Sequence, residues 1–447
     1  MVTSAGFSRT APGAVPLLGH LPLLAWSPLG FLKGLSAYGP LVQIRIGRRP
    51  AYVVTRPDLV RRLHGDHYLF DKGGPFYETS RRFFGNGVVN CPAAEHAQQR
   101  PLMQPAFHRS RIQTYAEVMR DVAEEVVDSW RPGRVIRLDQ ETHRMTAMVA
   151  SRTLISAPQG GPAAAQIAAS HADIMQGLYW RMVIPGRLFP RLPLPVNRRY
   201  DRQVARTRRT VDDVVDHYRT TGTDHGDVLS MVIAACEQED DPQQAVFDQV
   251  VQILSAAVET TAAALVWTLR LLDRHPLVAQ RVLTEIEEVL EGRPPDHRSL
   301  TELPYTQRVL TEAIRLYPPG WLVSRATTAE VAWDEGRIPA GADVFFSHYT
   351  LHRDAGLFPD PDAFDPDRWS PERVTTAQRQ GFLGFGTGRR KCLGDVFGTT
   401  EATIALVTVL SRWRLRFQQC AERPVPRLLL LPPATPVMVE PRPGSGS

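Results

Sequence analysis

A single cysteine, Cys392, lies in a glycine-rich loop directly after three basic residues, in the stretch FGTGRRKCLG at 385–394. Glycine lets the backbone take tight or left-handed turns and approach a ligand closely. The backbone N–H groups and the cations Arg389, Arg390 and Lys391 favour a thiolate over a thiol. The stretch therefore indicates a cysteine nucleophile or a thiolate ligand for a soft metal. The alternative is a free cysteine that packs as a small apolar side chain.

A second candidate for chemistry is Glu259-Thr260-Thr261, which interrupts the longest apolar helical pattern of the chain at 247–272. Polar side chains in a core helix cost free energy unless they have a partner or a purpose. Thr260 has a plain alternative, because a helical threonine can donate to the carbonyl four residues earlier, here Ala256. Glu259 would then be an exposed acid with no function.

Two pairs of charged residues have helical spacing. His96 and Arg100 are four residues apart and share one face, which faces either solvent or an anion. Glu312 and Arg315 are three residues apart and can form an ion pair, which contributes little to stability where it is exposed. Neither pair is specific by itself.

Taken together and in this order, these motifs resemble those of the cytochrome P450 family. Five positions in ten residues match the haem-binding loop of that family, in which the cysteine thiolate is the axial iron ligand: Phe385, Gly388, Arg390, Cys392 and Gly394. The resemblance implies that Cys392 binds iron, that Phe385 packs near its sulfur and that Arg390 reaches a haem propionate. It implies haem b as the cofactor.

The resemblance gives the charged pairs their roles. It places His96, Arg100 and Arg325 against the haem propionates, and Gly394 in the cofactor-binding loop. It also implies a buried structural trio with no part in the chemistry, formed by Glu312, Arg315 and Arg368.

The stretch at 256–261 resembles the oxygen-activation motif of the same family. The resemblance implies that Thr260 hydrogen-bonds dioxygen or a water that supplies a proton, and that Glu259 gates the supply of protons. Ala257 stands where glycine is more usual, which bears on the width of the oxygen groove.

The elements that position these residues follow from the order of the patterns. Residues 1–28 are rich in proline and glycine and predict an irregular lead-in, and a β-hairpin is expected from 41–46 and 51–55. Helical patterns follow at 29–38, 112–130, 141–155, 197–218, 247–272 and 303–317. The predicted fold is mainly α with small β-sheets, a single cytochrome P450 domain over 29–440 with a prism-like helical part and a smaller β-rich region. Residues 441–447 are expected to be a flexible tail.

Composition excludes several other classes of protein. The net charge of +5 is modest, and no basic run with interleaved aromatic residues indicates nucleic-acid binding. The four cysteines match neither a zinc pattern nor a disulfide scaffold, which favours a reducing compartment. No apolar run reaches the roughly 18 residues of a membrane span, and no signal peptide is evident. We therefore expect a soluble, cytoplasmic monomer.

The stretches that line the substrate pocket in the family are apolar in this chain. The aromatic connection at 70–92 is expected to be mobile and to form one wall, and the proline-rich stretch at 185–195 to belong to the lid. The expected pocket residues are Phe76, Phe83, Phe84, Val88, Ile253, Leu254, Ala257, Val258, Trp321, Leu322, Val323 and Pro432. Such a pocket suits a neutral hydrocarbon skeleton held by burial. A cyclic sesquiterpene is the favoured substrate, a neutral polyketide or macrolide comes second, and a fatty acid, whose carboxylate would need Arg81 or Arg82, comes third.

The predicted function is that of a haem-thiolate monooxygenase, which inserts one atom of O₂ into a small hydrophobic molecule of secondary metabolism. A peroxygenase of the same fold would carry an arginine-containing motif in place of Glu259 and Thr260, and a haem sensor would need neither residue. Electrons are expected from an external ferredoxin with its NAD(P)H-dependent reductase. The acidic ferredoxin would meet a basic patch on the cysteine side, made of His108, Arg109, Arg111, Arg389 and Lys391.

Overall fold

Prolines and side-chain caps mark where the long helices of the protein begin. In the computed structural model, α11 starts at Pro242, α12 at Pro276 and α13 at Pro304, positions where the missing N–H has no helical partner to lose. The carboxylate of Asp241 caps α11 by accepting from the backbone N–H of Gln244 at 3.0 Å. The structure describes residues 9–155, 160–183, 189–222, 227–419, 421 and 423–442.

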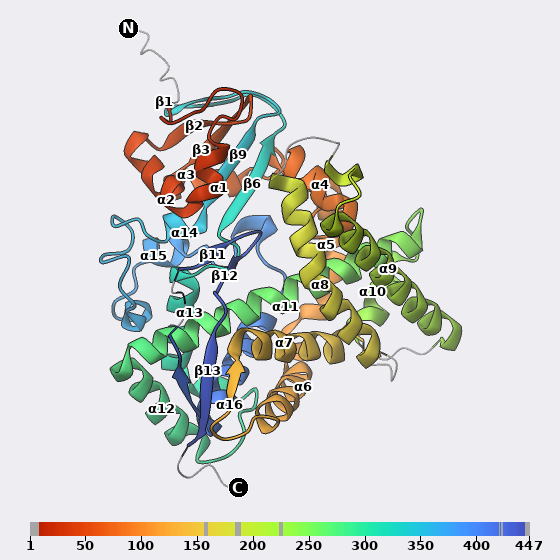
Figure 1. Ribbon diagram of the computed structural model, residues 1–447, viewed down its shortest axis with the longest axis vertical. Coiled ribbons are helices and arrows are strands. Elements are labelled where there is room, and N and C mark those ends of the chain that lie inside the picture. Colours follow the sequence, from red (N-terminus) through yellow and green to blue (C-terminus); the bar gives the residue numbers. More distant parts are fainter. Residues whose placement is uncertain are drawn as a thin grey trace.

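Helices make up most of the described chain (Figure 1). In chain order they are α1 Leu21–Trp26, α2 Pro28–Gly34, α3 Pro57–Gly65, α4 Gly74–Phe84, α5 Ala93–Met103, α6 Arg109–Asp128, α7 Leu138–Leu154, α8 Gly160–Val183, α9 Pro195–Thr221, α10 Val228–Cys236, α11 Pro242–Arg274, α12 Pro276–Leu290, α13 Pro304–Leu316, α14 His348–Leu351, α15 Thr376–Gly381 and α16 Asp395–Arg412. Short 3₁₀ turns include η2 Gln104–Phe107 and η6 Gly388–Arg390.

The largest sheet has six strands in the order β1-β2-β3-β9-β6-β4. Its strands are β1 Arg9–Thr10, β2 Leu41–Ile46, β3 Arg49–Val54, β4 Phe70–Asp71, β6 Leu322–Thr327 and β9 Asp343–Ser347. The β1–β2 and β3–β9 pairs are parallel and the other pairs are antiparallel. Figure 1 shows this sheet with α1, α2 and α3 at the N-terminal end of the molecule, away from α6 and α12.

Three smaller sheets complete the β structure. An antiparallel sheet joins β5 Val135–Arg137 to β13 Pro436–Pro441 and β10 Trp413–Phe417. Two-stranded ribbons are formed by β7 Val331–Trp333 with β8 Gly336–Ile338, and by β11 Val425–Pro426 with β12 Leu430–Leu431. These sheets confirm the predicted fold class, which was mainly α with small β-sheets.

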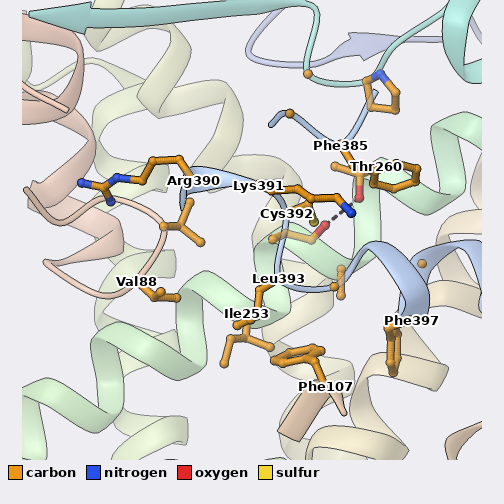
Figure 2. Close-up of a pocket in the computed structure, with 18 of the residues that line it drawn as sticks. Val88, Phe107, Ile253, Thr260, Phe385, Arg390, Lys391, Cys392, Leu393 and Phe397 are labelled. Atoms are coloured by element: carbon orange, nitrogen blue, oxygen red, sulfur yellow. Dashed lines mark hydrogen bonds between the residues drawn. The ribbon is translucent and has the colours of Figure 1, made fainter. Parts of the chain in front are cut away.

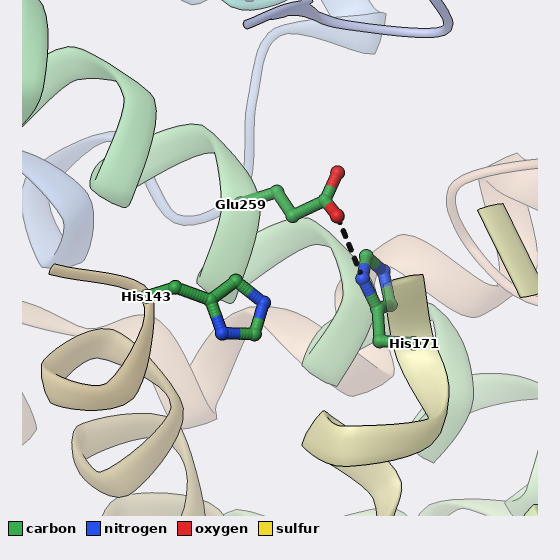
Figure 3. Close-up of side chains that lie close together, drawn as sticks. All are labelled: His143, His171 and Glu259. Carbon is green, nitrogen blue, oxygen red and sulfur yellow. Dashed lines mark hydrogen bonds and ion pairs between the residues drawn. The ribbon is translucent and has the colours of Figure 1, made fainter. Parts of the chain in front are cut away.

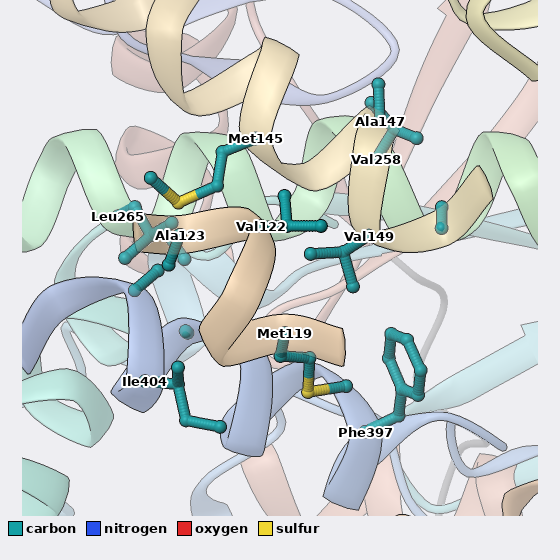
Figure 4. Close-up of a cluster of buried hydrophobic side chains, with 14 of the residues drawn as sticks. Met119, Val122, Ala123, Met145, Ala147, Val149, Val258, Leu265, Phe397 and Ile404 are labelled. Atoms are coloured by element: carbon teal, nitrogen blue, oxygen red, sulfur yellow. The ribbon is translucent and has the colours of Figure 1, made fainter. Parts of the chain in front are cut away.

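The main hydrophobic core lies where α6, α7, α11 and α16 meet (Figure 4). Met119 and Val122 from α6 face Val149 of α7 and Ile404 of α16, and all four are buried. Helix α11 crosses the middle of the molecule (Figure 1). Within the described residues it is the one helix long and apolar enough to span a membrane. Of its most apolar stretch of 18 residues, 67% is buried inside the protein. It is therefore the central core helix.

The expected hairpin is confirmed, since β2 and β3 pair antiparallel with Leu41 opposite Val54. The lead-in is more regular than predicted, because β1 pairs with β2 and α1 occupies Leu21–Trp26. Pro22 and Pro28 lie in the first turns of α1 and α2, where proline starts a helix and does not break it.

Two other expected elements differ from the structure. The single helix expected at 29–38 divides into α2 and a 3₁₀ turn, Leu35–Tyr38. The aromatic connection at 70–92 contains a helix of 11 residues, α4, at Gly74–Phe84. Of the expected tail at 441–447, residues 443–447 lie outside the described residues.

Candidate active site

A cavity of about 420 Å³ lies between α11, the cysteine loop and the connection that follows α4 (Figure 2). Its walls come from segments far apart in the chain. They include Val88 before α5, Thr260 on α11, Val323 on β6 and Phe397 on α16. Most of the wall is apolar, and the polar groups gather on the side of β6 and the cysteine loop.

The cysteine loop needs glycine at two positions. Gly386 and Gly388 both have φ of +66°, in the left-handed region that favours glycine. A Cβ on Gly388 would also lie 2.9 Å from the backbone oxygen of His64. The loop closes through a hydrogen bond of 2.8 Å from the Cys392 N–H to the Phe385 carbonyl. It presents the free thiol of Cys392 to the cavity, together with Phe385 and Gly394.

The basic neighbours of Cys392 favour its thiolate only in part, and the thiolate ligand stays a prediction. Burial raises the pKa of the Cys392 thiol, and the Gly394 N–H, Arg100 and Lys391 offset only part of that rise. The reason is that the cations are engaged elsewhere. Lys391 pairs with Asp395 at 2.5 Å. A bound metal cation would supply the missing stabilisation of the anion.

Three of the predicted propionate-binding residues line the same side of the cavity, two arginines and a histidine. Arg325 is buried and donates to the Tyr77 hydroxyl at 3.2 Å, and Arg390 pairs with Asp71 at 3.3 Å. Burial, reinforced by Arg390 and Lys72, lowers the pKa of His96 to about 3, so its ring is neutral and can donate one hydrogen bond. The two guanidinium groups carry the positive charge, so this side of the cavity favours an anion.

Arg100 lines the cavity but is directed to the cysteine loop. Its Nη1 donates to the carbonyls of Lys391 at 2.7 Å and Arg389 at 3.2 Å. As placed, it holds the loop that carries Cys392.

Lys72 lies in the same group of basic residues and was missed from the sequence. Burial lowers its pKa well below the usual range, and Arg325 and Arg390 lower it further. It lines the cavity beside Arg325. The only signal in the sequence was its rarity, since Lys33, Lys72 and Lys391 are the three lysines among 52 basic residues. The cluster of cations beside a cysteine thiol fits the propionates and iron of a haem.

On α11, the cavity residues follow a helical stripe at spacings of three and four: Ile253, Leu254, Ala256, Ala257, Thr260, Thr261 and Ala264. The Thr260 hydroxyl donates to the Ala256 carbonyl at 2.6 Å, so the back-bonded geometry is present. Thr260 also borders the cavity. The back-bonded geometry is therefore present, and the catalytic role of Thr260 stays a prediction that its place at the cavity allows.

Glu259 lies off the stripe and does not line the cavity as placed. Its carboxylate points to His171 on α8, with Oε1 3.1 Å from the imidazole Nδ1 (Figure 3). Burial raises the pKa of Glu259, but His171, and more weakly His143, lower it by more, so the net pKa is below its usual range. Neither histidine was singled out from the sequence.

The predicted structural trio is a buried network behind the cavity. Glu312 Oε2 accepts from Arg315 Nε at 2.8 Å, and Glu312 Oε1 accepts from Arg368 Nε at 3.4 Å. The Trp369 indole also donates to Glu312, at 2.8 Å. Further donors of Arg315 bond to the carbonyls of the segment at 352–363. The network ties α13 to the stretch that precedes the cysteine loop.

Of the predicted pocket residues, five line the cavity: Val88, Ile253, Leu254, Ala257 and Val323. Six others do not, namely Phe76, Phe84, Val258, Trp321, Leu322 and Pro432, and the side chain of Phe83 lies outside the described part of the structure.

These exceptions have physical reasons. Val258 turns into the main core beside α7, where the Thr146 hydroxyl donates to its carbonyl at 3.0 Å. Leu322 and Val323 point to opposite faces of β6, because side chains alternate along a strand. The indole of Trp321 is buried under the sheet and donates to the Arg427 carbonyl at 2.9 Å.

The segment that carries Val88 and Val89 to the cavity is fastened to α11 by polar side chains. Asp248 accepts from the Asn86 N–H at 2.7 Å, Gln249 accepts from the Val88 N–H at 3.1 Å, and Gln252 accepts from the Val89 N–H at 2.7 Å. All three are buried. The sequence carries a signal for these contacts, namely three polar residues on an apolar helix, because buried polar side chains need partners.

The chain is similar to known proteins over nearly its whole length. The family model described as Cytochrome P450 matches residues 10–439. Cyclooctatin synthase of Streptomyces melanosporofaciens is 42% identical over 437 residues, which cover 97% of this chain and 95% of that protein. Pentalenene oxygenase of Streptomyces avermitilis is 40% identical over 419 residues, 93% of each chain. Among solved structures, the haem domain of cytochrome P450DA superposes with a TM-score of 0.87 over 98% of both chains at 24% identity, a likeness of fold.

Proposed function

The chain belongs to the cytochrome P450 family, and on that premise we propose that it oxygenates a neutral, terpene-like hydrocarbon in the cavity beside Cys392. It is an oxidoreductase that incorporates oxygen from O₂, a haem-thiolate monooxygenase. The observation that carries the substrate class is the apolar wall formed by α11 and the 85–89 segment.

The residues around the cavity suit haem b as the cofactor. The Cys392 sulfur would hold the iron, and His96, Arg325 and Arg390 would meet the propionates. When bound, the haem supplies the oxidising chemistry. The protein contributes orientation, exclusion of water and control of protons.

In this proposal the two catalytic residues act in sequence. The Thr260 hydroxyl holds a proton at the cavity wall, which its place on the α11 stripe allows. The Glu259 carboxylate takes up a proton from solvent on the side of α8, leaves His171, turns toward the cavity and passes that proton to the Thr260 hydroxyl.

The class of substrate depends on whether a cation at the cavity is free to bind a substrate carboxylate. The cations at the cavity are those assigned to the propionates, so a substrate carboxylate would lack a desolvated partner. A fatty acid would need Arg81 or Arg82, and neither lines the cavity. Arg81 donates to the carbonyls of Asn90 and Lys72. Two relatives, cyclooctatin synthase and pentalenene oxygenase, oxidise terpenes. This similarity supports a terpene over a macrolide as the substrate.

Spectral titration of the ferric protein tests the proposal. A cyclic sesquiterpene hydrocarbon should shift the iron from low to high spin, while a macrolactone and a long-chain fatty acid should shift it less. Incubation with the terpene, O₂ and reducing partners should then yield an oxygenated product. If only the fatty acid shifts the spectrum, and Arg81→Ala abolishes that shift, the neutral-substrate proposal is wrong.

Electrons would come from a separate protein, and we assign a ferredoxin with its NAD(P)H-dependent reductase. Support comes from the exposed basic residues around the cysteine loop, among them Arg109 and Arg389. The enzyme would act as a cytoplasmic monomer, in keeping with the free thiols of Cys91 and Cys236.

A further inference from the structure

Three potential metal ligands from three helices meet beside the active site. They are His143 on α7, His171 on α8 and Glu259 on α11, and one ligand atom from each lies within 4.8 Å of the other two. Figure 3 shows the two imidazole rings on either side of the Glu259 carboxylate. His171 Nδ1 is already 3.1 Å from Glu259 Oε1. Among the residues that the structure describes, this is the one such group of three.

His171 is buried, His143 and Glu259 are partly buried, and the cluster is incompletely bonded. Side-chain exposure is 5% for His171 and 13% for Glu259. The Nε2 atoms of His143 and His171 are both buried, and neither has a hydrogen-bond partner within the described parts of the chain. A buried polar group without a partner is destabilising. The unpartnered imidazole nitrogens therefore mark a cluster that can still accept a ligand.

Neutral imidazole and ionised carboxylate are the forms that bind metals, so a cation that binds here releases any protons that these three groups carry.

We propose that His143, His171 and Glu259 bind one divalent cation of the zinc type. Two imidazole nitrogens and one carboxylate oxygen are a common donor set for Zn²⁺, with water as the fourth ligand. Imidazole ligands disfavour Mg²⁺ and Ca²⁺, which prefer oxygen. Ligands at about 2.1 Å from one ion are roughly 3.4 Å apart when tetrahedral. Small side-chain rotations therefore close the cluster, and His171 and Glu259 are already near that separation.

Binding would also regulate the enzyme, a consequence that rests on the proposed function. Glu259 must leave His171 to supply a proton to Thr260. A cation that holds the carboxylate and both imidazoles prevents that rotation. Zinc is thus expected to inhibit product formation without displacing the haem from Cys392.

The binding test uses the untagged, haem-loaded protein after treatment with a chelator. Equilibrium dialysis against micromolar Zn²⁺, followed by elemental analysis, should give one zinc per haem iron, and Mg²⁺ should not bind. His143→Gln should weaken zinc binding by at least about 100-fold, since even loss of a partner behind a ligand costs 10–100-fold. His217→Ala, which changes a half-buried histidine of α9, is the matched control and should bind zinc normally.

Absorption at the zinc edge separates this site from haem iron and should show two imidazoles and a carboxylate around zinc. The haem content and Soret band of His143→Gln report whether it has folded, and His171→Asn is a second variant in case it has not. Equal zinc binding by wild type and both folded variants, or no binding by wild type, would overturn the proposal. If zinc binds as expected but leaves turnover unchanged, the metal site stands and the role of Glu259 in the proposed function is wrong.

Discussion

Thr260 has two roles in the structure that a pair of substitutions can separate. Its hydroxyl borders the cavity and also donates to the Ala256 carbonyl, whereas Thr268, two turns further along α11, is buried and donates to Ala264 at 2.7 Å. Thr260→Ala should keep haem and substrate binding but lower the product formed per NADPH consumed by several-fold, because the cavity loses a proton-holding group. Hydrogen peroxide should rise in proportion.

Thr268→Ala is the control for helix bending. It removes the same kind of hydrogen bond and should cost about 1 kcal/mol of stability with unchanged coupling of NADPH to product. Unchanged coupling in Thr260→Ala as well would reduce Thr260 to a helix-bending residue.

Glu401 on α16 is a buried acid whose ionisation should limit stability. Burial raises its pKa well above the usual range, and the Thr261 hydroxyl offsets little of that rise. The folded protein therefore keeps a proton that the unfolded chain releases above a pH of roughly 4.5. Its contribution to stability is full below that pH and falls as the pH rises toward the folded pKa, by at most ~1.4 kcal/mol per pH unit.

Glu401→Gln cannot ionise, so its melting temperature relative to wild type should increase steadily between pH 5 and pH 8. Glu330→Gln, at an acid with 60% side-chain exposure, should show no such trend. A difference between Glu401→Gln and wild type that stays constant with pH would show that Glu401 is ionised in the folded protein.

At the scale of elements, the cavity wall before α5 depends on Gln252 of α11. Its amide donates to the carbonyls of Phe84 at 2.5 Å and Gly85 at 3.2 Å, and its oxygen accepts from Val89. Gln252→Leu keeps the volume but removes these bonds, and the exposed backbone groups should cost roughly 1–3 kcal/mol. We expect the Kd of the substrate, from the spin-state titration, to rise between about 5-fold and 100-fold.

Gln243→Leu makes the same change on the same helix, where the side chain contacts Asp212 and Arg219 and is not bonded to the wall. It should leave the Kd of the substrate unchanged. Equal affinities for wild type and Gln252→Leu would show that the 85–89 segment holds its place without α11.

The sequence predicted best what depends on local pattern. Period-3.6 apolar positions located α6, α7, α11 and α13 within a few residues, and alternation located β2 and β3. The position of a side chain on its element was less secure: Val258 lies next to a cavity residue but faces the core. The contact of His171 with Glu259 joins residues 88 positions apart. No local pattern encodes such a contact, because the packing of α8 on α11 decides it.

At the scale of the whole molecule, the exposed basic residues around the cysteine loop predict where the electron donor binds. The start of α6 lies beside that loop, since the Phe107 and Phe397 rings pack edge to face at 6.4 Å. His108, Arg109, Arg111 and Arg389 are exposed there. Lys391 contributes less, because Asp395 pairs with it. This basic patch would steer an acidic ferredoxin toward the cysteine side of the cavity.

Reversal of charge in the patch tests whether the ferredoxin binds on the cysteine side. Reduction of the double variant Arg109→Glu, Arg389→Glu by an acidic ferredoxin should be slower by about 10-fold or more at low salt, because attraction becomes repulsion. Arg48→Glu changes an exposed arginine at the turn between β2 and β3, on the opposite part of the molecule from α6 (Figure 1), and should be reduced at the wild-type rate. The wild-type rate itself should fall as ionic strength rises, since screening shortens the reach of the patch to about 8 Å near 0.15 M salt. If the reduction rate does not change with salt, or if Arg48→Glu slows reduction as much as the double variant does, the donor binds elsewhere.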